Sequence, residues 1–272
     1  MIGSEGLKGK IRNIANSKNL RSQEVLQMFF FERFLERLSK SKYKFNFVIK
    51  GGLLISSMIG IDNRTTMDMD TTIKGVPLKE EVIRNIISEI INVEVNDGIE
   101  FEITNISHIR EEDEYENFRV HLIANFDKIK NDIKIDITTG DAITPKEIEY
   151  LYPCMFQEES LETILAEKYE SVIKRNITTT RMRDFYDLYN LYNLRKEEID
   201  FDILKQAIIS TANRRESLPL MKQAIEIIED IKDDDYLKEL WKVYLADNLY
   251  IGDLNFSETV KVVEIIAEKI AL

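Results

Sequence analysis

The chain has 272 residues, a formal net charge of −12, one cysteine and 44% hydrophobic residues. This length allows one large domain or two modest ones, and the hydrophobic content is ordinary for a globular protein. No apolar run approaches the roughly 20 residues that a membrane-spanning helix needs, and the first residues lack the apolar core of a secretory signal. We therefore expect a cytoplasmic protein that does not engage a membrane.

The one cysteine, Cys154, excludes an internal disulfide and a cysteine-based zinc cage. It lies in an aromatic stretch, YLYPCMF, where we expect a buried structural thiol. A catalytic cysteine would need a histidine partner, and the two histidines, His108 and His121, both fall in predicted strands. We therefore expect no catalytic role for any of the three.

The negative charge argues against indiscriminate nucleic-acid binding, because affinity for the phosphate backbone depends on clustered Lys and Arg. Residues 1–50 nevertheless hold eleven basic and four acidic side chains, so this segment carries +7 and the remainder −19. It could hold RNA beside an acidic site, or it could be an ordinary solvated helix surface. The sequence leaves both interpretations open.

Two helices are predicted at residues 7–18 and 22–41, because apolar residues recur there at spacings of three and four. Ser22 is the expected N-cap of the second helix. Its Phe29, Phe30 and Phe34 are expected in the core rather than on a base-stacking surface. The apolar run at 45–49 then predicts a strand.

A turn at Lys50-Gly51-Gly52 follows that strand and precedes a predicted helix at 53–59. Glycines allow close backbone approach, and the N–H groups at a helix start can face a phosphate. A Gly-Gly turn alone is a weak indication of a phosphate site.

The next segment, 64–73, is predicted to be a strand that carries two acids. In an extended chain alternate side chains share one face. That face would carry Arg64, Thr66, Asp68, Asp70 and Thr72, with Met67, Met69 and Ile73 packed beneath. Asp68 and Asp70 would lie about 7 Å apart, with a repulsion of about 2 kcal/mol at an effective dielectric near 20. A divalent cation such as Mg²⁺, which prefers oxygen ligands, would remove that repulsion. The alternative is an edge strand with a solvated polar face.

Together these elements resemble the signature of the polymerase-β-type nucleotidyltransferase superfamily. More narrowly, Lys50-Gly51-Gly52 followed by Arg64-x-Thr66-x-Asp68-x-Asp70 resembles the AbiEii/AbiGii toxin family of bacterial nucleotidyltransferases. Gly52 stands where Ser is commoner in the superfamily, and fifteen residues separate Gly52 from Asp68. Both departures fit the AbiEii-like branch, and the resemblance covers about residues 25–192.

Beyond this segment a helix is predicted from Pro77 to Asn92, followed by strands at 99–109, 118–126 and 133–138. In the last strand Lys134, Asp136 and Thr138 would share a face opposite three isoleucines. The residues alone do not select Asp136 over Asp132 or Asp141 as a third carboxylate. The superfamily resemblance implies Asp136, which would complete the metal cluster and help to activate the attacking hydroxyl.

After Pro145 and Pro153 the pattern predicts helices only. They are expected at 161–175, 181–194, 201–212, 218–231, 236–245 and 257–270, the last with Ser257 as N-cap. In the first two, Leu-Ala-Glu-Lys and Arg-Asp-x-x-Asp-Leu again resemble the AbiEii-like pattern. The resemblance implies that Lys168 and one of Asp184 and Asp187 complete the active site, and it does not decide between the two acids.

The resemblance implies an α+β fold, with a polymerase-β-like nucleotidyltransferase mixed sheet and flanking helices followed by an α-helical C-terminal domain. The expected domains are 1–155, which holds the sheet and the N-terminal helices, and 156–272, which holds the other helices and completes the active site. Two Mg²⁺ ions, with Mn²⁺ as an alternative, would bind Asp68, Asp70 and Asp136. Gly51 and Gly52 would approach the triphosphate.

Other residues carry less defined roles. Lys168 would neutralise charge on the triphosphate as a compact cation, with Asp187 as a further catalytic residue and Asp184 as a nucleotide-binding residue. Arg64 and Thr66 would either act at the margin of the metal site or brace the strand.

The implied function is Mg²⁺-dependent transfer of a nucleoside monophosphate from a nucleoside triphosphate to the 3′ end of tRNA. The protein would be the toxin of a toxin–antitoxin or phage abortive-infection system, with its antitoxin encoded separately. One alternative is a protein hydroxyl as acceptor. Another is a non-catalytic nucleotide-binding or partner-binding module, which the three intact acids disfavour. A carboxylate-pair hydrolase is weaker still, because such an enzyme does not need the Gly-Gly turn.

Overall fold

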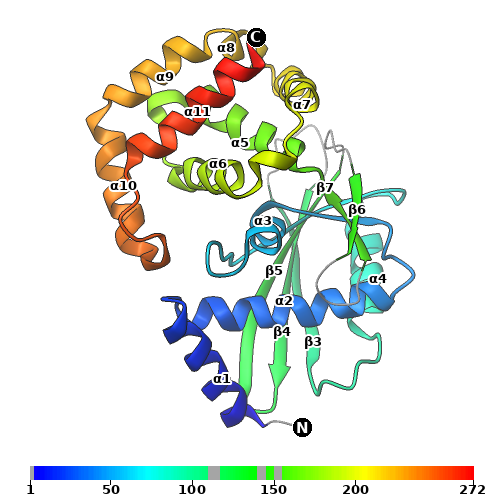
Figure 1. The fold of residues 1–272 in the computed structure, drawn as a ribbon. Coiled ribbons are helices and arrows are strands. Elements are labelled where there is room, and N and C mark those ends of the chain that lie inside the picture. Colours follow the sequence, from blue (N-terminus) through cyan, green and yellow to red (C-terminus); the bar gives the residue numbers. More distant parts are fainter. Residues whose placement is uncertain (1–2, 110–116, 140–144, 150–154) are drawn as a thin grey trace. The chain divides into compact units, whose positions relative to one another are not determined.

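The computed structural model describes residues 3–109, 117–139, 145–149 and 155–272, with only the backbone of 145–149 and 155–159 described (Figure 1). Contacts divide the chain into two compact units, the first ending at Glu159 and the second continuing from Ser160. No helix in the described ranges is both long and apolar enough to cross a membrane. Cys154 and Asp141 lie outside the residues whose structure is described.

The first unit is built on a mixed sheet in the order β3-β4-β5-β2-β1-β7-β6. The strands are β1 (Phe47–Lys50), β2 (Met69–Ile73), β3 (Glu100–His108), β4 (Asn117–Phe126), β5 (Ile129–Thr138), β6 (Pro145–Glu149) and β7 (Met155–Glu159). β2 runs parallel to β5, and β1 parallel to β7, whereas the other neighbours are antiparallel. The two central strands β1 and β2 therefore connect two antiparallel pieces.

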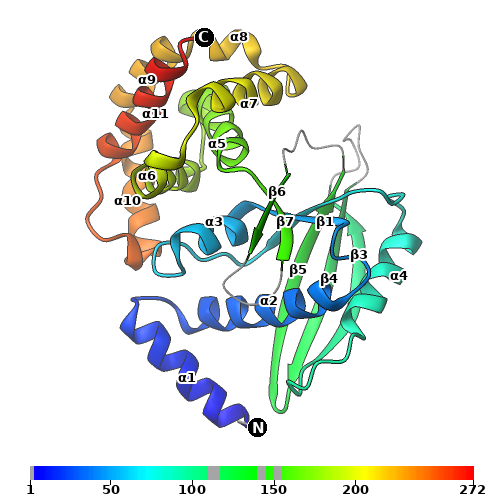
Figure 2. The same ribbon diagram turned by 45° about the vertical axis from the view of Figure 1, so that its right-hand side comes forward.

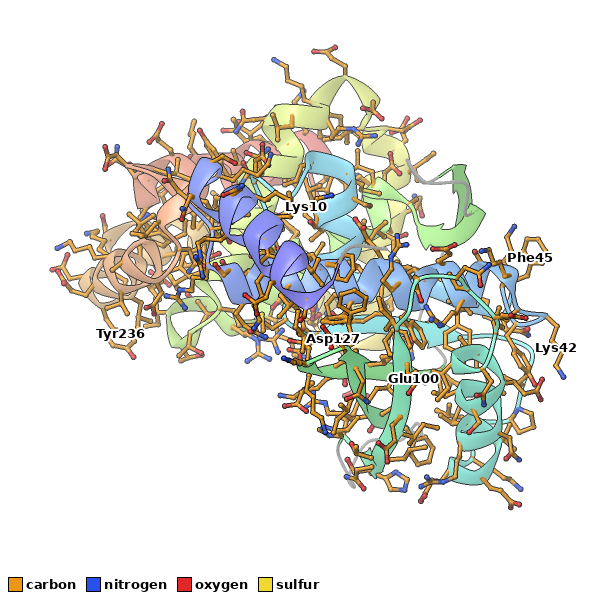
Figure 3. All side chains as sticks on the ribbon, turned by 90° about the horizontal axis from the view of Figure 1, so that it is seen from below. Lys10, Lys42, Phe45, Glu100, Asp127 and Tyr236 are labelled. Carbon is orange, nitrogen blue, oxygen red and sulfur yellow. The ribbon has the colours of Figure 1, made fainter. Side chains whose placement is uncertain are left out.

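The described residues of this unit form the helices α1 (Ser4–Ser17), α2 (Ser22–Lys40), α3 (Gly51–Ile59) and α4 (Glu80–Ile91). Helix α2 runs across one face of β3, β4 and β5 (Figures 1 and 2). The alternating isoleucines of β5, at 133, 135 and 137, are fully buried, as the sequence predicts. Phe30 and Phe34 are also fully buried, which confirms their place in the core, whereas Phe29 is only half-buried. In the segment between α2 and β1, Lys42 and Phe45 project into solvent (Figure 3).

The second unit is helical. It contains α5 (Leu161–Arg175), α6 (Met182–Arg195), α7 (Phe201–Arg214), α8 (Leu218–Met221), α9 (Ala224–Asp233), α10 (Asp235–Asp247) and α11 (Phe256–Ile270). Its core includes fully buried Tyr169, Phe185 and Val263. Trp241 on α10 donates its indole N–H to the carbonyl of Leu254 at 2.8 Å, which fixes the chain before α11.

The prediction of helices only after Pro145 is wrong, because β6 and β7 form there and β7 pairs with β1. Both strands are short and carry several charged residues, and β6 is an edge strand, so hydrophobic alternation does not reveal them. The predicted helix at 218–231 is also interrupted. Gln223 N–H bonds to Leu220 O at 3.0 Å, an i to i−3 contact that separates α8 from α9.

The starts of three predicted helices also differ from those in the structure. Helix α4 begins at Glu80 rather than at Pro77. Ser22 is the first residue of α2 and not its N-cap; Arg21 is the N-cap, and its backbone N–H is bound by the Glu24 side chain at 2.8 Å. In the last helix the N-cap is Asn255 rather than Ser257, and Glu258 accepts from the Asn255 backbone N–H at 3.0 Å.

A buried ion pair ties α2 to the start of β3. Arg37, whose side chain is 3% exposed, donates to both carboxylate oxygens of Asp97 at 2.8 and 2.9 Å and to the carbonyl of Ile99 at 2.7 Å. Burial alone would raise the pKa of Asp97, but hydrogen bonds from Arg37 and the Ile99 backbone hold it below its ordinary value. The stabilisation from this pair is therefore present near neutral pH and is lost as pH falls through the folded-state pKa of Asp97.

We predict that Asp97→Ala lowers the free energy of unfolding by about 3 kcal/mol, because it leaves the buried Arg37 guanidinium without its counter-charge. Chemical denaturation at neutral pH measures this loss. Glu102→Ala, at an exposed position of β3, is the control and should change stability by less than about 0.5 kcal/mol. Equal effects of the two substitutions would contradict the assigned importance of the pair.

Candidate active site

Four charged side chains lie in a row across the sheet of the first unit. Strand pairing makes Lys50 on β1 the partner of Asp70 on β2, Asp70 the partner of Asp136 on β5, and Asp136 the partner of Arg119 on β4. Paired residues in a sheet project from the same face. Asn131 of β5 bonds to α2 from the opposite face, so the row lies on the face away from α2.

The parallel pairing of β2 with β5 places two carboxylates on adjacent strands. Neighbouring strands are about 4.8 Å apart, and two unit negative charges at that distance repel by roughly 3 kcal/mol at an effective dielectric near 20. Asp68, two residues before Asp70, adds a third acid and is half-buried. The acids that the sequence singled out are therefore brought together by register, and their repulsion needs compensation.

Arg119 supplies part of that compensation. Its Nε and Nη2 atoms each donate at 2.7 Å to a different carboxylate oxygen of Asp136. This bidentate geometry is the strongest form of an arginine–carboxylate contact. The hydrogen bonds that Arg119 donates to Asp136, with further attraction to Asp136, Asp68 and Asp70, raise the pKa of the Arg119 guanidinium above its ordinary value. Asp136 is thus held by a permanent cation.

Gly51 approaches the carboxylate of Asp70 more closely than any other residue type could. A Cβ atom on Gly51 would lie 2.2 Å from Oδ2 of Asp70, and the residue has φ +65°, a left-handed value. On the other side of the turn, the Lys50 Nζ donates to Thr138 Oγ1 at 2.9 Å. The predicted glycine turn therefore lies directly against the predicted acid.

Gly52 packs against the residues that precede β2. A Cβ atom there would lie 2.8 Å from both Arg64 Nη2 and Thr66 Oγ1. Arg64 and Thr66 are buried, at 2% and 6% exposure, and the Thr66 hydroxyl bonds to the carbonyl of Asp68 at 3.0 Å. Of the two roles left open for Arg64 and Thr66, these contacts favour bracing.

The strand prediction for 64–73 is partly wrong. β2 begins only at Met69, and residues 64–68 form a loop. Met67, expected beneath the sheet, is 41% exposed. Side-chain bonds to the loop backbone, such as that of Thr66, replace the ladder bonds that a strand would make.

Helix α2 also holds this loop. Gln27, 1% exposed, donates to the carbonyl of Met67 at 3.1 Å and accepts from Asn131 of β5 at 2.7 Å. Gln23 bonds to the same asparagine at 2.7 Å. One buried amide therefore links the segment that carries Asp68 to the strand that carries Asp136. Sequence reasoning missed Gln27 because a lone glutamine on an apolar helix face gives no distinct signal.

In the second unit, Lys168 lies between two acids of the next helix. Its Nζ is 2.7 Å from Asp184 Oδ1 and 3.1 Å from Asp187 Oδ2. Asp187 is fully buried, Asp184 is 4% exposed, and Ser171 donates to the second oxygen of Asp184 at 2.9 Å. The structure thus brings together Lys168 and both of the acids that the sequence could not separate.

The acids of the first unit suit a hard cation by donor type, because Mg²⁺ prefers carboxylate oxygens. Among the described residues, however, no group of three or more acidic, histidine or cysteine side chains is arranged to hold a metal. Both oxygens of Asp136 accept hydrogen bonds from Arg119. Asp68 and Asp70 have the donor type that a hard cation takes, whereas Asp136 is committed to the guanidinium.

Comparison with solved structures identifies the fold. A protein from H. pylori, whose crystal structure is described as that of a nucleotidyltransferase, superimposes with a TM-score of 0.57 at 18% identity, over 92% of this chain and 96% of that chain. JHP933 from Helicobacter pylori gives a TM-score of 0.55 at 17% identity, over 90% of this chain and 91% of that chain. The fold is that of a nucleotidyltransferase, as predicted.

The family follows from the sequence profile described as nucleotidyl transferase AbiEii toxin, type IV toxin–antitoxin system, which matches residues 33–270. The chain belongs to the AbiEii nucleotidyltransferase toxin family. It is therefore an enzyme of the nucleotidyltransferase class, and membership of a toxin–antitoxin family implies a separate antitoxin. Among curated protein sequences, none matches the chain at a significant level.

We predict that Gly51→Ala destabilises the protein more than Gly75→Ala does. Both glycines have positive φ, +65° and +72°, so both substitutions incur a left-handed backbone cost of about 1–2 kcal/mol. Only the Cβ at Gly51 meets Asp70, because the one at Gly75 makes an ordinary contact of 3.5 Å with Asn46 Nδ2. Denaturant unfolding of the two variants measures the difference, and equal losses would show that the turn does not press on the carboxylate.

Proposed function

We propose that this nucleotidyltransferase transfers a nucleoside monophosphate from a nucleoside triphosphate to an RNA 3′ hydroxyl, with the end of tRNA as the favoured acceptor. The acceptor oxygen bonds to the α-phosphorus, the bond between the α- and β-phosphates breaks, and pyrophosphate leaves. The proton of the acceptor hydroxyl passes to solvent water. The observation that supports this most is the register of Asp70 with Asp136 beside the Gly51 turn.

Each residue of the candidate site has a proposed role in this reaction. Asp68 and Asp70 would hold Mg²⁺, which when bound supplies charge stabilisation at the transferring phosphoryl group. Because Gly51 has no side chain, a phosphate oxygen could approach a backbone N–H group beside Asp70. Asp136, fixed by Arg119, would orient the acceptor hydroxyl. Lys168 would neutralise triphosphate charge, with Asp184 and Asp187 fixing its position.

An RNA acceptor is supported by the charges of the second unit. Ser171–Arg183, at the junction of α5 and α6, contains no acid and four cations, Lys174, Arg175, Arg181 and Arg183. The three arginines are exposed, and none forms an ion pair with any described residue. An exposed arginine that forms no ion pair is well suited to bind phosphate groups. Many cations of residues 1–50 are instead paired, among them Lys8, Lys18, Arg33, Arg37, Lys40 and Lys42.

A protein acceptor is the second candidate, since the same carboxylates could orient a serine, threonine or tyrosine hydroxyl. We further propose that the toxin acts in abortive infection, because nucleotide addition to tRNA 3′ ends would halt translation. This biological role rests on family membership and on the RNA acceptor.

We predict that Asp68→Asn and Asp70→Asn each reduce nucleotide transfer by about 100-fold or more, because both remove charge that phosphoryl transfer needs and preserve shape. The assay supplies each labelled triphosphate in turn with Mg²⁺ and total cellular RNA or protein. Asp132→Asn, at an exposed position on the same face of β5 as Asp136, should retain activity. Label in protein alone would refute the RNA acceptor, and full activity of Asp70→Asn would refute the site.

We predict that combined Arg175→Gln, Arg181→Gln and Arg183→Gln weakens binding of tRNA to an Asp70→Asn background and lowers the salt dependence. Loss of three phosphate contacts should reduce the slope of log affinity against log salt by about 2–3. The matched control, Lys196→Gln, Lys222→Gln and Lys242→Gln, removes the same charge from exposed positions of the second unit. Equal slopes for the two triple variants would contradict a specific RNA contact.

A further inference from the structure

The contact between Arg119 and Asp136 conflicts with a simple three-carboxylate metal site. Both Asp136 oxygens accept hydrogen bonds at 2.7 Å from one guanidinium. The Asp136 side chain is 14% exposed, so few directions remain from which another cation can reach it. Any ion that binds Asp136 in this arrangement must compete with Arg119.

The contact is built into the sheet rather than formed by a flexible surface chain. Arg119 and Asp136 are direct partners in the antiparallel pairing of β4 with β5, and their side chains leave from the same face. On its other side, Asp136 is the direct partner of Asp70. The guanidinium therefore lies at the end of the carboxylate row and acts as its fixed counter-charge.

We propose that Arg119 occupies the place of a second metal ion. The nucleotide-free protein then binds one divalent ion through Asp68 and Asp70, while Asp136 stays bonded to Arg119. A second ion binds only when the guanidinium releases Asp136. Arg119 is thus a positioning residue that acts through Asp136. The proposal deepens the proposed function and rests on its metal site.

The test measures binding of Mn²⁺ alone, without nucleotide, by the loss of the free-ion signal in electron paramagnetic resonance. The wild-type protein should bind one ion. Arg119→Gln keeps a polar side chain but removes the charge, so it should bind a second ion or bind the first about tenfold more tightly. Arg119→Lys, which keeps the charge and loses the bidentate fit, should fall between the two.

A double-mutant comparison identifies Asp136 as the group released. In the wild-type background, Asp136→Asn should change the affinity for the single ion by less than about twofold. In the Arg119→Gln background it should remove most of the gain, because the newly exposed ligand is gone. Thermal unfolding with and without Mn²⁺ gives an independent check, since stabilisation by a ligand rises with its affinity.

The outcomes separate this proposal from the proposed function. Unchanged stoichiometry and affinity in Arg119→Gln, with binding lost in Asp70→Asn, would overturn the role of Arg119 and leave the metal site standing. Unchanged Mn²⁺ binding in Asp70→Asn would overturn both. Weaker binding in Arg119→Gln would show that Arg119 supports the ion rather than excluding it, and would also overturn the proposal.

Discussion

The structure of the first unit depends on the register between two parallel strands, β2 and β5. This register places Asp70 beside Asp136, an arrangement that electrostatics alone would disfavour. The hydrophobic alternation of β5 fixes it, because a shift by one residue would turn three buried isoleucines to solvent. Core packing thus forces the acids together, and Arg119 and Lys50 flank the row with positive charge.

The loop that carries Asp68 is fixed by a different means. It makes no strand ladder, so its backbone groups depend on side chains, including Gln27 from α2 and Thr66 within the loop. Gly52 allows Arg64 and Thr66 to pack closely beneath α3. The two glycines therefore have separate roles. Gly51 leaves room for the carboxylate of Asp70, and Gly52 leaves room for Arg64 and Thr66, which hold the loop.

Much of this could be predicted from the sequence, for reasons that particular residues make clear. The isoleucines of β5 alternate strictly, so the face of Asp136 was readable from the period of two. Strand order was not readable, because it depends on pairing between distant segments. Thus Arg119 as the partner of Asp136, and β7 as the neighbour of β1, gave no local signal. The start of β2 is misplaced in the sequence prediction because Met67 continues the apolar alternation, although it lies in a loop and is 41% exposed.

The charges around the carboxylates suggest why a nucleotide would need accompanying cations. Lys50, Arg64 and Arg119 equal Asp68, Asp70 and Asp136 in number, so the ionised group carries no surplus of positive charge. A bare triphosphate would therefore gain little net attraction from it, whereas a triphosphate with bound divalent ions carries much less charge. Charge balance thus supports the proposed dependence on Mg²⁺, independently of how many ions the carboxylates hold.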